Sequence, residues 1–343
     1  MRPLRPPLAA LFGRGTSTCF IVREDHRLLR FGFWCGHGLH RPNVGPRVTG
    51  LLSGNLVSRC LVGVVEFPLD AEASYLVEKN LGIVVPYRDR AEHLQLFVPH
   101  VAAFFSNAAR YVGGNVSITI VQQEYGLEFN RGFMNNIGYS LSKKECDYIC
   151  FHDVDYMPIQ ADYSEPNGFA PIAWYGFERR TDPRNFTFIE DNLEFFFGGV
   201  VLFRKNDFEK VNGFANAYWG WGWEDSDIFN RCILEEVSLT RRKGTFKVLP
   251  HMHMGYDISG ETIVGSVAHR RNNELFRKRF PFPARFHPSK SEIDVNRQTC
   301  MKENDGLSTI EFSILDRKPI PRPTTDERGL KIEIVTVSVR RPK

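Results

Sequence analysis

The chain has 343 residues, of which 42% are hydrophobic and 13% are aromatic, so it can bury a sizeable core as one large domain or one and a half. Its 44 Lys and Arg against 40 Asp and Glu give a formal net charge of +4, which does not favour nucleic acid or a membrane surface as a partner. The 7 cysteines include no CxxC pair and leave an odd one over, so a disulfide-stapled secreted scaffold is not expected.

Residues 1–78 mix Arg, Gly and Pro with isolated apolar pieces and show no sustained helical or strand period. We therefore predict a poorly defined N-terminal extension there. Its apolar runs fall well short of the roughly 20 residues that a membrane-spanning helix needs, so no transmembrane segment is predicted. The first residues, MRPLRPPLAALFGRG, resemble a secretory signal only weakly.

From residue 79 onward, short apolar strands alternate with amphipathic helices. In chain order, we predict a strand in LGIVVPYRDR that Pro86 stops, a helix in AEHLQLFVPHVAAFF, a strand in VSITIVQQ, a helix in GFMNNIGYSLSKK and a strand in CDYICFHDVD. This alternation is typical of an α/β domain with a mostly parallel sheet and flanking helices. Such Rossmann-like sheets bind ligands at the carboxyl ends of their strands.

The ends of these three strands carry residues suited to a nucleotide. They are Pro86, Tyr87, Arg88 and Arg90 after the first strand, Phe129, Asn130 and Arg131 after the second, and Asp153 and Asp155 after the third. A base can stack on an aromatic ring while guanidinium groups meet ribose or phosphate oxygens. Each arginine alone could be an ordinary loop residue, but their convergence on one edge predicts a nucleotide site.

The triplet Asp153-Val154-Asp155 predicts a metal site. Strand alternation would place both carboxylates on the same side, where one can ligate a divalent cation and the other can hold ribose or a metal-bound water. Further along, LPHMHMG offers His251 and His253 on one face of an extended segment. Imidazole ligands beside a carboxylate suit Mn²⁺ better than Mg²⁺, so we predict Mn²⁺ as the cofactor. Which histidine ligates it stays open.

The stretch YWGWGWEDSD (218–227) brings three of the five tryptophans together with three carboxylates. A buried core strand would not tolerate these acids, and a solvated turn would not collect so many indole rings. Apolar sugar faces pack on indole rings, so tryptophans beside acids are typical of a pyranose site. Gly220 and Gly222 are consistent with a loop that closes over a bound donor, or with a simple turn.

With the segment FFFGGVVLFRKNDFEKVNGFANAYWGWGWEDSDIFNR, the chain resembles the β-1,4-galactosyltransferase family of inverting, metal-dependent GT-A glycosyltransferases that use UDP-sugars. The motifs occur in the family's order, from VVPYRDR, FNR and FHDVDYMP to DGLSTIEFSILD at residues 305–316. The resemblance implies a GT-A domain over residues 79–320, followed by a C-terminal tail or strand over residues 321–343.

The resemblance also implies roles for the residues of the nucleotide and metal sites. Arg88, Arg90, Phe129 and Arg131 would hold uridine and ribose at the strand end that carries Pro86 and Tyr87. Asp155 would ligate the metal together with a histidine that matches His253 or His251, and which of these two ligates stays open. Asp153 would lie close to the ribose and the donor sugar.

The remaining implied roles concern the two sugars. Phe196, Gly198 and Gly199 would belong to the donor-sugar pocket, and Trp221 would lie between donor and acceptor. Glu224 and Asp225 would bind the acceptor, with Asp225 as the catalytic base. Phe196 stands where galactose-specific members usually have a tyrosine, so UDP-galactose and UDP-N-acetylgalactosamine both stay open as donors, with a slight preference for galactose. Ser226 stands where a third acid is frequent.

We therefore predict transfer of galactose or N-acetylgalactosamine from a UDP-sugar to a hydroxyl of a carbohydrate acceptor. The alternatives are a metal-dependent nucleotide-sugar hydrolase and a non-catalytic carbohydrate-binding protein, and neither would transfer sugar to an added acceptor. Because no anchor is found, we expect a cytoplasmic location; the Golgi lumen is the alternative if the true start is missing. The acceptor, the linkage and the oligomeric state stay open.

Overall fold

The computed structural model describes residues 79–107, 114–173, 197–242, 244–249, 267–321 and 330–341, and the backbone of four short strands nearer the N-terminus. The chain divides into two compact units, residues 1–76 and 77–343. The first unit holds two antiparallel pairs, β1 (Arg23–Asp25) with β2 (Leu28–Arg30) and β3 (Val48–Gly50) with β4 (Gly63–Val65).

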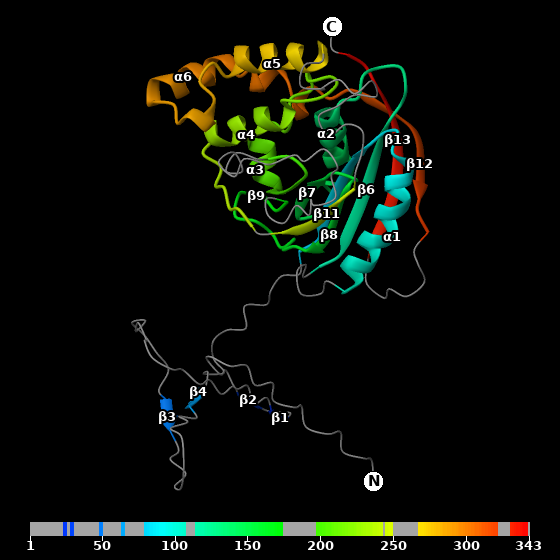
Figure 1. Cartoon of the computed structure of the whole chain (residues 1–343), viewed down its shortest axis with the longest axis vertical. Helices are drawn as coiled ribbons and strands as arrows, with labels where there is room; N and C mark the ends of the chain where they lie inside the picture. The colour runs from blue at the N-terminus through cyan, green and yellow to red at the C-terminus, as the bar shows by residue number, and fades with distance from the viewer. Residues whose placement is uncertain are drawn as a thin grey trace. The chain divides into compact units, whose positions relative to one another are not determined.

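A seven-stranded sheet forms the centre of the second unit, with the strand order β12-β13-β6-β5-β7-β10-β9 (Figure 1). The strands are β5 (Leu81–Tyr87), β6 (Val116–Gln123), β7 (Tyr148–His152), β9 (Phe169–Pro171), β10 (Val200–Arg204), β12 (Phe312–Pro319) and β13 (Lys331–Val339). The four strands β13, β6, β5 and β7 run parallel. At one edge β12 pairs antiparallel with β13, and at the other β10 pairs antiparallel with both β7 and β9. The predicted, mostly parallel sheet is confirmed.

The helices of this unit cover both faces of the sheet. They are α1 (Ala91–Asn107), α2 (Arg131–Ser142), α3 (Lys205–Lys210), α4 (Glu224–Leu234), α5 (Val267–Arg279) and α6 (Lys290–Thr299), with short 3-10 turns at Ala284–Phe286, Lys302–Asn304 and Leu307–Thr309. A separate two-stranded sheet pairs β8 (Tyr156–Gln160) with β11 (Thr245–Val248). Among the described residues, no helix combines the length and the apolar character that crossing a membrane requires.

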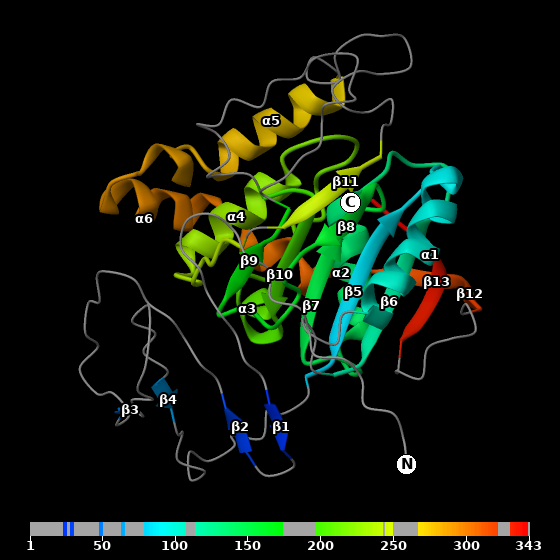
Figure 2. The ribbon, with the colours of Figure 1, turned by 60° about the horizontal axis from the view of Figure 1, so that its bottom comes forward.

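The alternation of side chains along β5 explains why both faces of the sheet are covered. Ile83 and Val85 pack in one core with Phe97 of α1, whereas Val84 packs in a second core with Ile137 of α2. Every residue of β5 is buried, as expected for a central parallel strand. Figure 2 shows α1 on one side of β5 and β6 and α2 on the other. The predicted order of strands and helices through β7 is therefore correct.

Pro86 does not stop the strand, contrary to the sequence prediction, because β5 continues to Tyr87. The pairing between β5 and β7 ends at Val84, so Pro86 has a strand neighbour only on the β6 side. A proline without a backbone N–H is tolerated where one side of the strand is unpaired. Strand β5 therefore extends one residue beyond Pro86, toward the predicted nucleotide site.

Candidate active site

The carboxyl ends of β5, β6 and β7 lie side by side, as the sequence predicts, because the three strands are parallel neighbours (Figure 2). Arg88 follows β5, and its guanidinium lies 5.4 Å from the ring centroid of Phe129, which follows β6. Arg88 also donates a hydrogen bond of 2.7 Å to the carbonyl of Leu127. The two predicted nucleotide-binding residues Arg88 and Phe129 therefore form one aromatic and cationic surface, and the buried Tyr87 ends the strand beside it.

Arg131 is the centre of the site because it joins the sheet edge to the start of α4. Its Nε donates to Asp153 Oδ1 at 2.7 Å, and its Nη1 lies 3.6 Å from Glu224 Oε1. Burial opposes the charged form, but the carboxylates of Asp153 and Glu224 outweigh it and raise the pKa of Arg131. Its Nη2 is buried and has no hydrogen-bond partner among the described residues. Arg131 thus contacts both Asp153, which is predicted beside the ribose and the donor sugar, and Glu224, which is predicted at the acceptor. Its role in holding uridine and ribose stays a prediction.

Asp153 and Asp155 lie in the turn between β7 and β8, not in a strand as the alternation argument assumed. They still belong to one site, because Asp153 contacts Arg131 and Asp155 Oδ1 lies 3.5 Å from Arg90 Nη1. Burial raises the pKa of Asp153 although Arg131 opposes that shift, and the charge of Asp155 adds to the rise. The two carboxylates therefore lie close enough for their charges to interact.

Gly199 shapes the wall beside this acidic turn. Its carbonyl accepts the Asp153 N–H at 2.9 Å, and its φ of +81° lies in the left-handed region that favours glycine. A Cβ at this position would lie 2.7 Å from the ring of Tyr156. Gly198 is also buried in this segment. Both predicted donor-pocket glycines therefore lie next to the metal motif, while Phe196 lies outside the described residues.

Glu224 and Asp225 form the first turn of α4, where backbone N–H groups favour negative charge. Trp223 immediately before them adopts a left-handed conformation with φ of 79°. Burial, together with the neighbouring charge of Asp225, raises the pKa of Glu224 to about 7. Asp225 Oδ1 accepts a 2.7 Å hydrogen bond from the N–H of Ser226. The two predicted catalytic carboxylates are therefore adjacent, and Arg131 links Glu224 to Asp153.

The tryptophan loop that precedes α4 is held by α5, which the sequence analysis did not predict. The buried Asn272 donates from its amide to the carbonyls of Trp219, Trp221 and Gly222 at 3.1, 3.3 and 3.2 Å. His269 packs against Trp221 with ring centroids 5.2 Å apart. The sequence did carry a sign of this role. Asn272 lies four residues from both Ala268 and Phe276, on the helix face where an apolar side chain is expected.

Trp221 remains 43% exposed at the tip of this loop, so its indole is available to a ligand. The two other metal ligands implied by the resemblance, His251 and His253, lie outside the described residues. Within the residues that are described, no group of three His, Cys, Asp or Glu side chains is arranged to hold a metal ion. Of the predicted metal ligands, Asp155 is the one that lies among the described residues, and its role stays a prediction.

Two family profiles match this chain in agreement with that geometry. One, the N-terminal region of glycosyl transferase group 7, matches residues 68–164, and the other, the N-terminal domain of galactosyltransferase, matches residues 185–267. Among curated relatives, β-1,4-galactosyltransferase 7 of Drosophila melanogaster is 33% identical over 53% of this chain and 55% of its own length. The xylosylprotein 4-β-galactosyltransferase of Caenorhabditis elegans is 36% identical over 52% of this chain and 57% of its own length. The chain thus spans about half the length of these curated relatives.

Solved structures agree with the sequence comparison. The catalytic domain of the Drosophila β-1,4-galactosyltransferase 7 in complex with xylobiose has a TM-score of 0.54 and 25% identity, over 77% of this chain and 95% of that domain. A variant of the same enzyme, solved with manganese, UDP-Gal and xylobiose, has the same TM-score at 24% identity and the same coverage. These are GT-A folds with the same mostly parallel sheet. From its profiles, its motifs and its fold, the chain belongs to glycosyl transferase group 7, the family of the β-1,4-galactosyltransferases.

Proposed function

We propose that this protein transfers galactose from UDP-galactose to a hydroxyl of a sugar acceptor, with inversion at the anomeric carbon. The observation that carries the proposal is the link through Arg131 between Asp153 at the sheet edge and Glu224 at the start of α4. This link joins the predicted donor side of the site to the predicted acceptor side. The galactosyltransferase names of the relatives support the same donor sugar.

In this proposal, Asp225 removes the proton of the acceptor hydroxyl. The acceptor oxygen forms a bond to the anomeric carbon, the bond from that carbon to the UDP oxygen breaks, and UDP leaves on the opposite face. Arg131 and Glu224 hold the donor and acceptor hydroxyls in position between them. Arg88 and Phe129 bind the nucleotide by charge and ring contact. The indole of Trp221 packs on an apolar sugar face.

The residues at the sheet edge fit the Mn²⁺ that we propose as cofactor. The side chain of Asp155 is buried, with 5% of its surface exposed, and its contact with Arg90 is long at 3.5 Å. Asp153 and Asp155 place two carboxylates in one turn, and carboxylate oxygens are ligands that divalent cations take. When bound, the cation supplies charge neutralisation for the diphosphate leaving group. His251 and His253 are the other ligands in the proposal.

We propose a pyranose as the acceptor, and xylose is the first to test. The Drosophila structures contain xylobiose, and the nematode relative is named for a xylosylprotein. N-acetylglucosamine, glucose and N-acetylgalactosamine are the comparison acceptors. UDP-N-acetylgalactosamine is the comparison donor. The cytoplasmic location stays a prediction.

A transfer assay tests the proposal directly. Purified protein with Mn²⁺ is given each UDP-sugar and each acceptor, and UDP release and the glycosylated product are both measured. We expect product with UDP-galactose and loss of activity after chelation. Release of UDP without product would identify a hydrolase instead. Binding of sugar without UDP release would identify a non-catalytic carbohydrate-binding protein.

The same preparation tests the metal site through Asp155→Asn. We expect a weaker Mn²⁺ titration and weaker donor binding, because one buried anionic ligand is lost. Asp294→Asn on α6 is the matched control, since that aspartate is 53% exposed and lies in a surface ion pair with Arg297. An Mn²⁺ titration of Asp155→Asn that matches the control would contradict the assignment of this carboxylate to the metal.

A further inference from the structure

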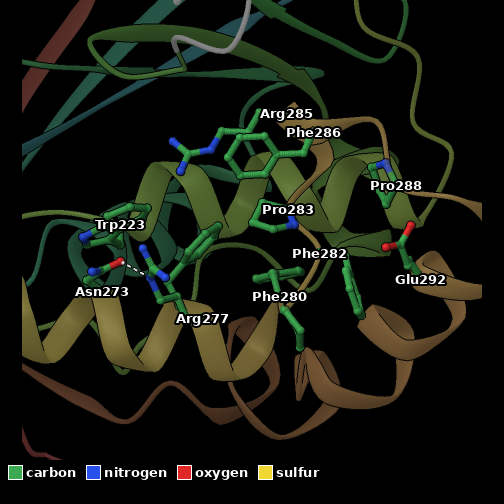
Figure 3. Close-up of a pocket in the computed structure, with 12 residues that line it drawn as sticks. Trp223, Asn273, Arg277, Phe280, Phe282, Pro283, Arg285, Phe286, Pro288 and Glu292 are labelled. Carbon is green, nitrogen blue, oxygen red and sulfur yellow. Dashed lines mark hydrogen bonds between the residues drawn. The ribbon is translucent and has the colours of Figure 1, made fainter.

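A pocket of about 300 Å³ lies between the start of α4, helix α5 and the segment that leads into α6 (Figure 3). It shares one residue with the candidate active site, because Trp223 lines the pocket and directly precedes the catalytic carboxylates Glu224 and Asp225. A volume of this size is at the lower end of ordinary ligand pockets, about 300–1,000 Å³. The pocket therefore continues the active site along the surface toward α6.

Aromatic rings form the floor and the rim of this pocket. Trp223 stacks on Phe276 with centroids 4.8 Å apart, and Phe276 lies 5.4 Å from Phe280. At the rim, Phe282 and Phe286 are 37% and 67% exposed. Exposed rings beside stacked buried rings are typical of a surface that packs on a ligand, above all on the flat apolar faces of sugar rings.

The charges along the pocket are unevenly distributed. Arg277 and Arg285 line it, and among the described residues neither guanidinium forms an ion pair with a carboxylate. In Figure 3 both guanidinium groups lie toward the Trp223 end, whereas Glu292 lies at the opposite end. Glu292 is already bound by the N–H and the hydroxyl of Ser289 in a capping box. The positive charge therefore lies at the end nearest the catalytic carboxylates.

We propose that this pocket is a subsite for an acidic sugar residue linked to the acceptor sugar that reacts at Asp225. The inference rests on the proposed function, since it extends the acceptor site of that reaction. The reacting sugar occupies the tryptophan loop, and the next residue of the glycan packs against Trp223 and Phe286. Arg277 and Arg285 bind its carboxylate or sulfate group through charge-assisted hydrogen bonds.

The surroundings of the pocket favour an anion over a neutral ligand. Helix α5 carries Arg270, Arg271, Arg277, Lys278 and Arg279 against a single acid, Glu274. Arg279 already forms buried ion pairs with Asp227 and Asp305. Arg277 and Arg285 are therefore the guanidinium groups of the pocket wall that stay available to a ligand. The small volume of the pocket fits one or two sugar residues better than a folded protein partner.

Four glycosides of one acceptor sugar test the subsite. We use the sugar that the transfer assay identifies, or xylose otherwise. The methyl glycoside does not reach the pocket. The 4-carboxyphenyl and 4-sulfophenyl glycosides carry an aromatic ring with a carboxylate or a sulfonate group. The 4-carbamoylphenyl glycoside has the same ring without a charge and is the neutral match. We expect the acidic glycosides to have KM values about fivefold to tenfold below that of the neutral match.

Two double variants separate the pocket from the general charge of the surface. Arg277→Gln with Arg285→Gln should abolish the preference for acidic glycosides and leave the KM for the methyl glycoside within about twofold. Lys278→Gln with Lys290→Gln removes the same charge from exposed residues that do not line the pocket, and should keep the preference. Phe286→Ala should raise the KM of all aryl glycosides but not of the methyl glycoside.

The outcomes distinguish this inference from the proposed function. Absence of transfer to every acceptor would overturn the proposed function, and ligand-observed NMR with the same four glycosides would then decide the subsite by binding alone. Equal affinity for the acidic and neutral glycosides overturns the subsite. A preference that survives the arginine double variant, or that is lost equally in the lysine double variant, overturns it as well.

Discussion

Two charged clusters lie at the start of α4, one buried and one partly buried, and they differ in how completely their charges are matched. The paired cluster consists of Asp227, Arg231, Arg279 and Asp305, in which two carboxylates meet two guanidinium groups. The acidic cluster consists of Arg131, Asp153, Glu224 and Asp225, in which three carboxylates share one guanidinium. Both draw acids from the same first turn of the same helix.

The difference shows how one sequence motif serves both structure and chemistry. Asp227 is fully buried, binds Arg231 at 2.6 Å and accepts a 2.9 Å hydrogen bond from Tyr218, so its charge is compensated. Glu224 instead has a pKa raised to about 7, because burial and the charge of Asp225 disfavour its ionised form. A compensated buried charge fixes the fold, whereas an uncompensated one is typical of a ligand site.

The largest expected effect comes from removing the base in the acidic cluster. Asp225→Asn keeps the shape of the side chain but cannot accept the acceptor's proton, so kcat should fall by about 10² to 10⁴. UDP-sugar and Mn²⁺ binding should change little, since the base acts on the other side of the anomeric carbon. Transfer rate and donor affinity are measured on one preparation. A parallel loss of donor binding and rate would contradict the role of this residue.

The paired cluster predicts the opposite kind of effect. Arg279→Met removes the guanidinium that pairs with Asp305 and one of the two guanidinium groups that pair with Asp227. The free energy of unfolding should therefore fall by about 3–5 kcal/mol. Arg297→Met is the control, because Arg297 is 45% exposed and its ion pairs lie at the surface; it should cost less than about 1 kcal/mol. Urea unfolding measures both. Similar losses would mean that the two clusters do not differ in how they support the fold.

The pKa of Glu224 predicts a pH dependence that is specific to the acidic cluster. Because burial raises the pKa of Glu224 in the folded state from the ordinary value of 4.5 to about 7, the folded state binds the proton more tightly, and stability falls as the pH rises from about 4.5 to about 7. Glu224→Gln removes the ionisable carboxyl group and therefore this loss of stability. In metal-free protein at pH 8, it should therefore raise the free energy of unfolding by about 1–3 kcal/mol while weakening acceptor binding.

Chelated samples unfolded with urea at pH 4.5 and pH 8 measure this effect. The gain from Glu224→Gln should disappear at the lower pH, where the wild-type carboxyl is protonated in the folded and in much of the unfolded state. Glu274→Gln on α5 is the control, since this glutamate is exposed and should show no comparable pH dependence. A gain that is equal at both pH values would show that the charge of Glu224 is not its cause.

The sequence predicted the elements that local periodicity determines, and it failed where the outcome depends on distant contacts. The apolar runs gave β5, β6 and β7 in the correct order, and parallel pairing then brought Arg88, Phe129 and Asp153 to one edge. The insertion of β13 beside β6 was not predicted, because alternation within residues 331–339 indicates a strand but not its neighbour. Likewise, the ion pair between Arg131 and Glu224 was not predicted, because the two residues lie far apart along the chain.

The smallest expected effect tests how α5 positions the tryptophan loop beside the acidic cluster. Asn272→Ala removes the amide whose two N–H groups are shared among the carbonyls of Trp219, Trp221 and Gly222, so Trp221 should lose its fixed position over the sugar. We expect kcat/KM for a monosaccharide acceptor to fall by about tenfold, within the range caused by small misplacements of binding groups. Most of the loss should be in KM, because Asn272 does not touch the acids that act on the reacting atoms. Asn273→Ala is the matched control, since its amide bonds Arg277 of the same helix and no other group in the described part of the chain, and a monosaccharide does not reach its pocket. The fluorescence change of the tryptophans on UDP-galactose binding should be altered by the first substitution and retained in the second. If both variants keep the wild-type KM and fluorescence change, α5 does not position this loop.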